Sequence, residues 1–301
     1  MKCLAQKEGK NFIVYNGDSV EVLKGVPSNS IHLSVTSIPF ASLYTYSNSE
    51  RDMGNSRTYE EFAEQYMFLG KEWYRVMMPG RNVCIHCMNL PTSKERDGYI
   101  GIRDFRGDVI RWMQTLGFIY HSEVCIWKDP VTAMQRTKAL GLLHKQIKKD
   151  SCMSRQGIPD YVVTFRKPGE NPEYVTHTNE SYPVSKWQKV ASPIWDEYAS
   201  PVWWDINPSD TLNGKLARED SDERHICPLQ LPVIERCVEL WSNPGDIVLD
   251  PFSGIGSTGY QALMMGRKYV GVELKESYFN LSCKNLMQAE ENKADEISLF
   301  D

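Results

Sequence analysis

The sequence predicts an α/β protein in which a mostly parallel sheet carries helices on both of its faces. Strand-like and helix-like segments alternate over residues 12–127 and again over residues 228–292, and this alternation is typical of strands joined by crossover helices. A glycine-rich turn at residues 254–259 follows a buried strand and opens a helix. Residues 128–222 lack the alternation and are expected to form an insertion or a small second domain.

The composition is that of an ordinary globular chain. Of its 301 residues, 41% are apolar and 24% are charged, and no apolar run approaches the ~18–20 residues that a membrane span needs. Residues 1–12 lack the apolar core of a signal peptide, and the eight cysteines stand at irregular spacings, unlike a secreted disulfide framework. We therefore expect a cytoplasmic protein.

The first alternating region contains strands and helices with recognisable boundaries. Asp18 follows a glycine and can cap a short helix, and Thr58 with Glu61 three residues later fits a capping box. Apolar residues at helical spacing continue that second helix to about Met77. The expected order is strand 12–15, helix 20–23, strand 31–36, loop 41–57, helix 58–77, a turn and a strand within 79–87, helix 105–116 and a strand within 117–129.

Two cysteines in this region, Cys84 and Cys87, have the C-x-x-C spacing of zinc ligands. A structural zinc site needs four ligands, and no second pair stands at a suitable spacing. The surrounding sequence NVCIHCMN is apolar and strand-like. Reduced cysteines in a core strand are therefore the preferred interpretation, and no metal is expected.

The second alternating region begins near Pro228. We expect a helix over 229–242, a strand over 247–250, the glycine loop with its helix, a strand over 268–274 and a final helix over 277–292. The 28 residues after Glu273 are too few for the further strands of a dinucleotide-binding fold. Those strands must come from upstream, so the fold is expected to be circularly permuted.

The glycine loop, VLDPFSGIGSTG, is the most informative segment. Gly254, Gly256 and Gly259 have the G-x-G-x-x-G spacing, and Glu273 ends the following strand. A helix N-terminus offers free N–H groups to a ligand, and an acidic residue after the next strand can accept hydrogen bonds from ribose hydroxyls. This pattern fits NAD, but Asp250 and Pro251 in front of the glycines suit a cationic amino-acid moiety better than a pyrophosphate.

Two segments together resemble a known family. VLDPFSGIGST resembles the S-adenosylmethionine loop of amino-group DNA methyltransferases, and VTSIPF, residues 35–40, is similar to their catalytic tetrapeptide, Asp/Asn/Ser-Pro-Pro-Tyr/Phe. Gly17-Asp18 is similar to the family's acidic position near the adenine ring, and RHICPLQLP to the segment before its cofactor loop. The tetrapeptide precedes the insertion and the cofactor loop follows it, which is similar to the β-class arrangement.

The resemblance implies a circularly permuted, Rossmann-like S-adenosylmethionine-dependent methyltransferase fold. Residues 1–127 would form its catalytic half, residues 128–222 an inserted target-recognition region, and residues 223–301 the cofactor-binding half of the same domain. The implied activity is site-specific transfer of a methyl group to adenine N6 or cytosine N4 of a flipped base in duplex DNA. The implied cofactor contacts are Asp18, Asp250, Pro251, Phe252, Gly254, Gly256, Ser257, Thr258 and Glu273.

Ser37, Ile38, Pro39 and Phe40 are the implied catalytic residues. An exocyclic amine is a poor nucleophile because the ring shares its lone pair, and two acceptors at its N–H groups would free that pair. Ser37 Oγ and the Ile38 carbonyl would be these acceptors, Pro39 would hold the turn, and Phe40 would stack on the base, a contact worth ~1–3 kcal/mol. The alternative is a buried strand that ends in a proline turn. Ile38 replaces the family's proline, which leaves adenine and cytosine equally open although a leading serine favours cytosine.

The insertion carries the candidate DNA contacts. The net charge is −5, yet residues 128–167 hold nine basic and three acidic residues. A local basic face can bind phosphates, and the alternative is a solvated helix face. The candidates are Lys138, Lys145, Lys148, Lys149 and Arg155, while Trp203 and Trp204 are expected in the core.

The implied partners are double-stranded DNA, a second copy of the chain in a homodimer, and a cognate restriction enzyme encoded separately; no membrane is expected. Two other functions stay open at this point. One is an RNA or protein amino-group methyltransferase on the same cofactor fold, and the other is a catalytically inactive DNA-binding relative.

Overall fold

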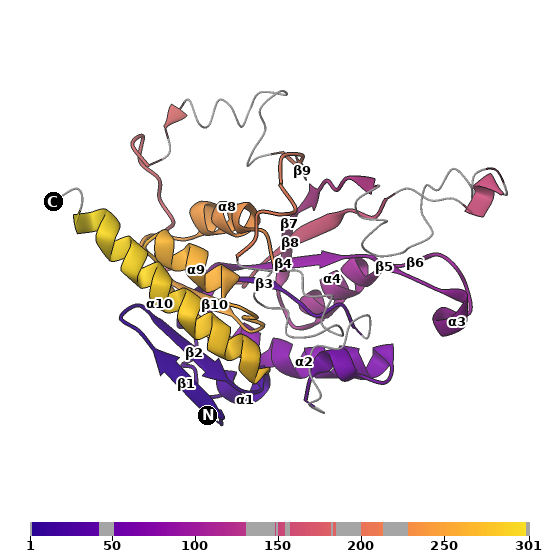
Figure 1. The fold of residues 1–301 in the computed structure, drawn as a ribbon, viewed down its shortest axis with the longest axis horizontal. Coiled ribbons are helices and arrows are strands. Elements are labelled where there is room, and N and C mark those ends of the chain that lie inside the picture. The colour runs from indigo at the N-terminus through magenta and orange to yellow at the C-terminus, as the bar shows by residue number, and fades with distance from the viewer. Residues whose placement is uncertain are drawn as a thin grey trace.

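The computed structural model describes residues 2–41, 51–130, 148, 150–153, 157–181, 183–184, 200–212 and 228–298. This part of the chain forms a nine-stranded sheet, in the order β1-β2-β11-β10-β3-β4-β8-β7-β9, and a separate two-stranded ribbon. Figure 1 shows helices on both sides of the sheet. The predicted α/β architecture is therefore confirmed.

The centre of the sheet is parallel and its edges are not. Five neighbours run parallel: β2 (Phe12–Asn16), β11 (Lys268–Glu273), β10 (Ile247–Asp250), β3 (Ile31–Ser37) and β4 (Met77–Met88). The remaining strands are β1 (Ala5–Glu8), antiparallel to β2, β8 (Asp160–Arg166), antiparallel to β4 and β7 (Ile119–Ile126), and β9 (Val202–Trp203), parallel to β7. The ribbon pairs β5 (Leu90–Pro91) with β6 (Ile102–Arg103).

The circular permutation is visible in the strand order. Strands β2 and β3, from the start of the chain, flank β11 and β10, from its end. The cofactor half predicted for residues 223–301 is therefore completed on both sides by N-terminal strands. Strands from the two ends of the sequence meet in one sheet.

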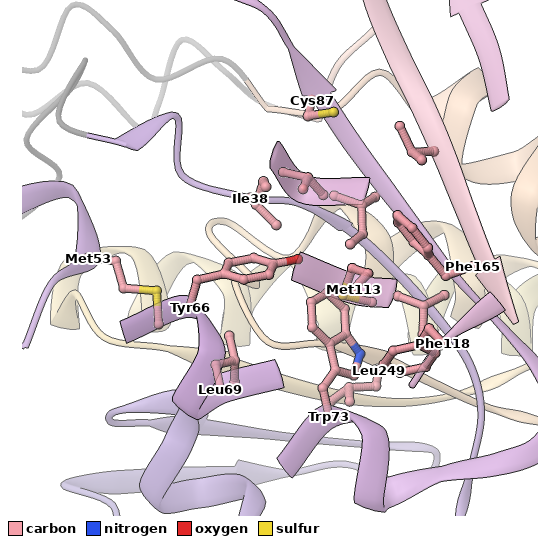
Figure 2. Close-up of a cluster of buried hydrophobic side chains, with 14 of the residues drawn as sticks. Ile38, Met53, Tyr66, Leu69, Trp73, Cys87, Met113, Phe118, Phe165 and Leu249 are labelled. Carbon is pink, nitrogen blue, oxygen red and sulfur yellow. The ribbon is translucent and has the colours of Figure 1, made fainter. Parts of the chain in front are cut away.

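Two hydrophobic cores hold the helices to the two faces. One face is covered by α8 (Leu231–Trp241), α9 (Ser257–Met264) and α10 (Glu276–Ser298). The other face is covered by α2 (Tyr59–Val76) and α4 (Phe105–Thr115), with α1 (Ser19–Leu23) beside α2. The short helices are α3 (Lys94–Asp97), η2 (Met53–Asn55) and η3 (Ser151–Met153). Figure 2 shows the second core, where Tyr66 and Trp73 of α2 lie under the sheet.

Local sequence explains where the helices begin. The Asp18 carboxylate accepts the Val20 N–H at 2.8 Å and caps α1, as predicted. Thr58 Oγ1 accepts the Glu61 N–H at 3.1 Å and caps α2. The reciprocal contact of a capping box differs, because Glu61 Oε2 accepts the N–H of Arg57 rather than that of Thr58.

Two strands of the main sheet come from within residues 128–222, the range predicted as an insertion. Residues 160–166 form β8 in the main sheet, between β4 and β7, and residues 202–203 form β9 at its edge. β8 pairs antiparallel with both of its neighbours and β9 lies at the edge, and antiparallel neighbours do not need the crossover helix that produces an α/β alternation. Trp203 is buried as predicted, but Trp204 is 64% exposed, so its assignment to the core is wrong.

The interpretation of Cys84 and Cys87 as core residues is confirmed. Both thiols are buried and free. Cys84 packs in the core under α8, whereas Cys87 packs in the core under α2, because residues three apart on a strand point to opposite faces. The two sulfur atoms therefore lie on opposite sides of the sheet and cannot ligate one ion.

Among the described helices, none combines the length and the apolar character that crossing a bilayer requires.

Candidate active site

The predicted site residues gather where the sheet changes direction. Strand β10 leads through α9 to β11 on one side, whereas β3 leads through α2 to β4 on the other side. The adjacent carboxyl ends of β3 and β10 therefore form a topological switch point, which is where open α/β sheets bind ligands. Ser37 ends β3 and Asp250 ends β10.

Asp250 joins the two halves of the site. Its Oδ1 accepts hydrogen bonds from the Thr36 hydroxyl at 2.6 Å and from the Phe252 N–H at 2.9 Å. Burial raises the pKa of this carboxyl to about 6, although hydrogen bonds from Thr36, Phe252 and Thr258 oppose the rise. Thr36 directly precedes Ser37, so one hydrogen bond fixes Asp250 of the glycine loop against the strand that ends in Ser37.

The glycine loop has the backbone that its sequence requires. Gly256 caps α9 with a φ of +86°, in the left-handed region that favours glycine. A Cβ atom there would lie 2.7 Å from Ser282 Oγ of α10. Ser257 and Thr258 follow in the first turn of α9 and are buried. The loop can therefore lie close to both a ligand and the neighbouring helix.

Glu273 is tied to the same loop. Its Oε2 accepts the Gly254 N–H at 2.8 Å and its Oε1 accepts the Lys275 N–H at 2.7 Å. Burial raises the pKa of Glu273 to about 7, against the effect of these two hydrogen bonds, and the nearby carboxylates of Asp52 and Asp250 add to the rise. Each carboxylate oxygen keeps a second lone pair that a ligand hydroxyl can use.

The remaining cofactor candidates lie beside these carboxylates. Asp18 is half-buried at the end of β2, where it caps α1. The Ser19 hydroxyl donates to the Pro251 carbonyl at 2.5 Å and so connects α1 to the cofactor loop. Phe252 is partly buried and packs against the α2-side core.

S-adenosylmethionine fits this set of residues. It carries a sulfonium and an ammonium group, and positive charge would favour the ionised forms of buried Asp250 and partly buried Glu273, whose pKa values are raised. A Cβ atom built on Gly254 would meet no atom closer than 4.0 Å, so this part of the loop faces open space. Asp250 would hold the cationic amino-acid part and Glu273 the ribose hydroxyls.

The tetrapeptide follows β3 without a break. Ser37 and Phe40 are partly buried at the rim, and Phe40 packs edge-on against the His86 ring at 6.1 Å between centroids. Ile38 is 1% exposed, and its side chain points into the α2-side core with Tyr66 and Cys87 around it (Figure 2). The departure from the family pattern thus has a packing role in this chain, and isoleucine supplies a backbone carbonyl as proline does.

Three residues that sequence reasoning missed extend the site. Ser37 Oγ lies 2.9 Å from His86 Nδ1, and His86 Nε2 lies 3.0 Å from Asp160 Oδ2. The Lys128 ammonium forms an ion pair with the same Asp160 oxygen. The residues come from β3, β4, β8 and the end of β7, so only the sheet order brings them together. The one local signal was His86 in an apolar strand, directly paired with Ser37 in the sheet register.

The predicted DNA contacts are mostly outside the described residues. The candidates outside them are Lys138, Lys145, Lys149 and Arg155, whereas Lys148 is described as an exposed helical residue.

A different exposed feature, a pair of tryptophan side chains, lies near the site. Trp127 and Trp204 are 42% and 64% exposed, with ring centroids 6.3 Å apart, after the carboxyl ends of β7 and β9.

One metal-like cluster appears in the described part of the chain, at the opposite end of β10. His32, Glu173 and Asp246 bring their ligand atoms within 4.8 Å of one another. However, His32 Nδ1 accepts the Ile247 N–H at 3.1 Å, so Nε2 carries the proton and donates it to Glu173 at 3.3 Å. Asp246 is also paired with buried Arg81. Neither imidazole nitrogen is free to bind an ion.

Comparison with known proteins agrees with this geometry. Residues 31–284 match the model of a DNA methylase family whose members methylate amino groups at N6 or N4. The chain belongs to this family. The match spans the tetrapeptide, β8 and the cofactor loop, so the N6/N4 methylase assignment covers both halves of the sheet.

Individual relatives of this methylase are distant. Type II methyltransferase M.BglII of Bacillus subtilis is 24% identical over 271 residues, which are 89% of this chain and 67% of that protein. Among solved structures, TTHA0409 of Thermus thermophilus in complex with S-adenosyl-L-methionine has a TM-score of 0.64 at 23% identity, and the match covers 93% of this chain and 96% of that one. The cytosine-N4-specific PvuII DNA methyltransferase also has a TM-score of 0.64, at 17% identity, with 98% and 97% covered. The predicted fold, cofactor and family are confirmed.

Proposed function

We propose that this DNA methyltransferase transfers the methyl group of S-adenosylmethionine to the exocyclic amine of one base, adenine N6 or cytosine N4, after the base leaves the duplex. Ser37 Oγ and the Ile38 carbonyl accept the N–H groups of that amine. Pro39 fixes the turn between them and Phe40 contacts the face of the base. Asp250 and Glu273 bind the cofactor from the other side of the switch point.

One observation carries this proposal: the 2.6 Å hydrogen bond from Thr36 to Asp250. It joins the strand that ends in Ser37 to the strand that ends in the cofactor loop, and it is buried. The exocyclic amine of the base, which is the nucleophile, and the methyl donor would thereby bind at neighbouring strand ends in one relative orientation. Alignment is the main contribution an enzyme makes when the methyl group is already activated by its sulfonium.

The exposed tryptophan pair supports a nucleic acid as the substrate. Trp127 and Trp204 follow the carboxyl ends of β7 and β9, the same sheet edge that holds Ser37. Aromatic side chains stack on bases that have left the helix or lost their partner, at ~1–3 kcal/mol per base. Extruding a base from the duplex costs unstacking and unpairing energy, and this pair is suited to contact the bases next to the target.

The first test is methyl transfer from labelled S-adenosylmethionine to mixed-sequence duplex DNA, followed by digestion to nucleosides and mass spectrometry. N6-methyladenine or N4-methylcytosine is expected, and its identity assigns the base. Unlabelled RNA is the competitor and should leave the rate unchanged. Transfer to RNA or protein instead, or no transfer to any substrate, would contradict the proposal and favour the two alternatives named above.

The biological context extends the same proposal. Relatives such as M.BglII are named type II methyltransferases, which supports a role beside a separately encoded restriction enzyme. Plasmid DNA methylated by this chain should then resist one specific endonuclease and remain sensitive to others. The homodimer stays a prediction, which light scattering of the purified protein would test.

A further inference from the structure

Ser37 does not stand alone at the rim of the site. A continuous chain of contacts runs from its hydroxyl through His86 to Asp160 and Lys128. His86 is 8% exposed and Asp160 is 2% exposed. Burying the polar and charged groups of this chain costs desolvation energy. The packing of the two hydrophobic cores does not require these groups, so another role has to account for them.

The direction of the hydrogen bonds between these side chains follows from Asp160 and Lys128. Burial alone would raise the pKa of Asp160, but the Lys128 ammonium and His86 hold it below its ordinary value. The ionised carboxylate accepts the proton on His86 Nε2. In the tautomer that donates from Nε2, the lone pair lies on Nδ1, and this nitrogen accepts the Ser37 hydroxyl proton.

This arrangement decides what Ser37 can offer to a substrate. Its hydroxyl proton is committed to His86, so only lone pairs of Oγ face the pocket. A serine without this partner could rotate and donate to the amine, which would bind the lone pair needed for attack. The same three residue types form the hydrolytic triad, here with the two imidazole nitrogens exchanged.

We propose that His86 is a positioning residue that fixes the Ser37 hydroxyl as an acceptor and takes up its proton after methyl transfer; this inference rests on the proposed function. The amine lone pair forms the N–C bond as the C–S bond of the donor breaks, and its electron pair stays on sulfur. The methylated nitrogen is then cationic. Its N–H proton passes to Ser37 Oγ while the Ser37 proton passes to His86 Nδ1. Asp160 stabilises the imidazolium until that proton reaches solvent.

The test compares His86→Asn with His86→Ala, Ser37→Ala and the double variant His86→Asn/Ser37→Ala. Asparagine can place an oxygen where Nδ1 lies and so keeps an acceptor for the serine, but it cannot take up a proton. Single-turnover methyl transfer should fall about 100-fold in every variant, in the range of general acid–base effects, with unchanged affinity for S-adenosylmethionine. The double variant should be no slower than either single variant, because residues that act as one unit are not additive.

Three controls separate the outcomes. His32→Asn changes the histidine at the other end of β3 and should keep the wild-type rate, and calorimetric cofactor binding verifies the fold of each variant. A wild-type rate in His86→Asn, or multiplicative losses in the double variant, would overturn the relay. A wild type that methylates nothing would instead overturn the proposed function, because the relay is measured only as a loss from a working enzyme.

Discussion

Replacing Asp250 by asparagine should stabilise the protein and weaken its cofactor binding. Asp250 is 4% exposed, and burial raises the pKa of its carboxyl from 3.8 to about 6. Each tenfold change in proton affinity is worth about 1.4 kcal/mol, so the ionised carboxylate costs the cofactor-free fold about 3 kcal/mol. Asparagine keeps the Oδ1 acceptor that Thr36 and Phe252 both use.

The stability difference between Asp250→Asn and the wild type should depend on pH, in a direction set by the raised pKa of Asp250. A carboxyl whose folded pKa is raised adds stability below its unfolded pKa and loses it as the pH rises through the folded value. The gain from Asp250→Asn should therefore be near zero at about pH 4, about half complete at pH 5, and full above pH 7, where it is about 3 kcal/mol. For a chain of this size that corresponds to a rise in Tm of roughly 5 °C.

The assay is thermal unfolding of wild type and variant at pH 5 and pH 8, without cofactor, beside calorimetric titration with S-adenosylmethionine. Loss of a buried hydrogen-bonded charge costs ~1.5–3 kcal/mol, so the affinity should fall at least tenfold. Saturating cofactor should then stabilise the wild type more than the variant. Equal stability gains at the two pH values, or an unchanged affinity, would refute the reasoning.

The remaining predictions concern the loop, the rim and the core. Gly256→Ala should lower stability by roughly 1–3 kcal/mol and cofactor affinity more than tenfold, because alanine at a φ of +86° is strained; a normal affinity by calorimetry would contradict this. Cofactor binding near pH 6.5 should release protons, since hydrogen bonds donated by the ribose hydroxyls favour the ionised form of Glu273, whose pKa is about 7; titration in two buffers measures the release, and Glu273→Gln should reduce it. Trp204→Ala should weaken DNA binding and leave Tm within about 2 °C, whereas Trp203→Ala should cost ~3–5 kcal/mol of folding free energy; gel-shift and unfolding data should separate the pair, and matching effects would sink the assignment of the exposed ring to DNA. Ile38→Ala should cost ~2–5 kcal/mol of stability, yet the folded fraction should methylate within a few-fold of the wild-type rate because the carbonyl remains; a much larger loss of rate would show that the side chain shapes the pocket.

The parts of the site that could be predicted from the sequence are those encoded by neighbouring residues. Asp250, Gly256 and Glu273 lie within one strand-loop-helix-strand unit, whose pattern has a direct backbone reason in the left-handed turn of the glycine. Ser37 could be found because VTSIPF, at the end of a β-rich segment, resembles the family's catalytic tetrapeptide. Each of these signals spans a few residues.

The parts that could not be predicted depend on sheet order. Asp160 is 74 residues from His86 along the chain, and the two meet because β8 lies antiparallel between β4 and β7. The hydrophobic periodicity of the sequence does not indicate that an antiparallel strand is inserted into a parallel sheet. The same strand was not predicted within residues 128–222, since its flanking Pro and Lys residues are typical of a loop. Trp203 and Trp204 are adjacent in sequence, and only their strand position makes one buried and the other exposed.

The position of β8 also bears on how such an enzyme could acquire a new recognition sequence. If the specificity-determining residues lie between β7 and β9, the coding region for them is divided by a strand that supplies Asp160 to the site and pairs with β4 along seven positions. A single cassette taken from a relative would replace that strand together with the recognition residues. Recombination would have to exchange two separate segments, one on each side of residues 160–166, while leaving the strand between them in place. Gradual substitution within each segment is therefore a shorter evolutionary route to new specificity than the transfer of a whole module.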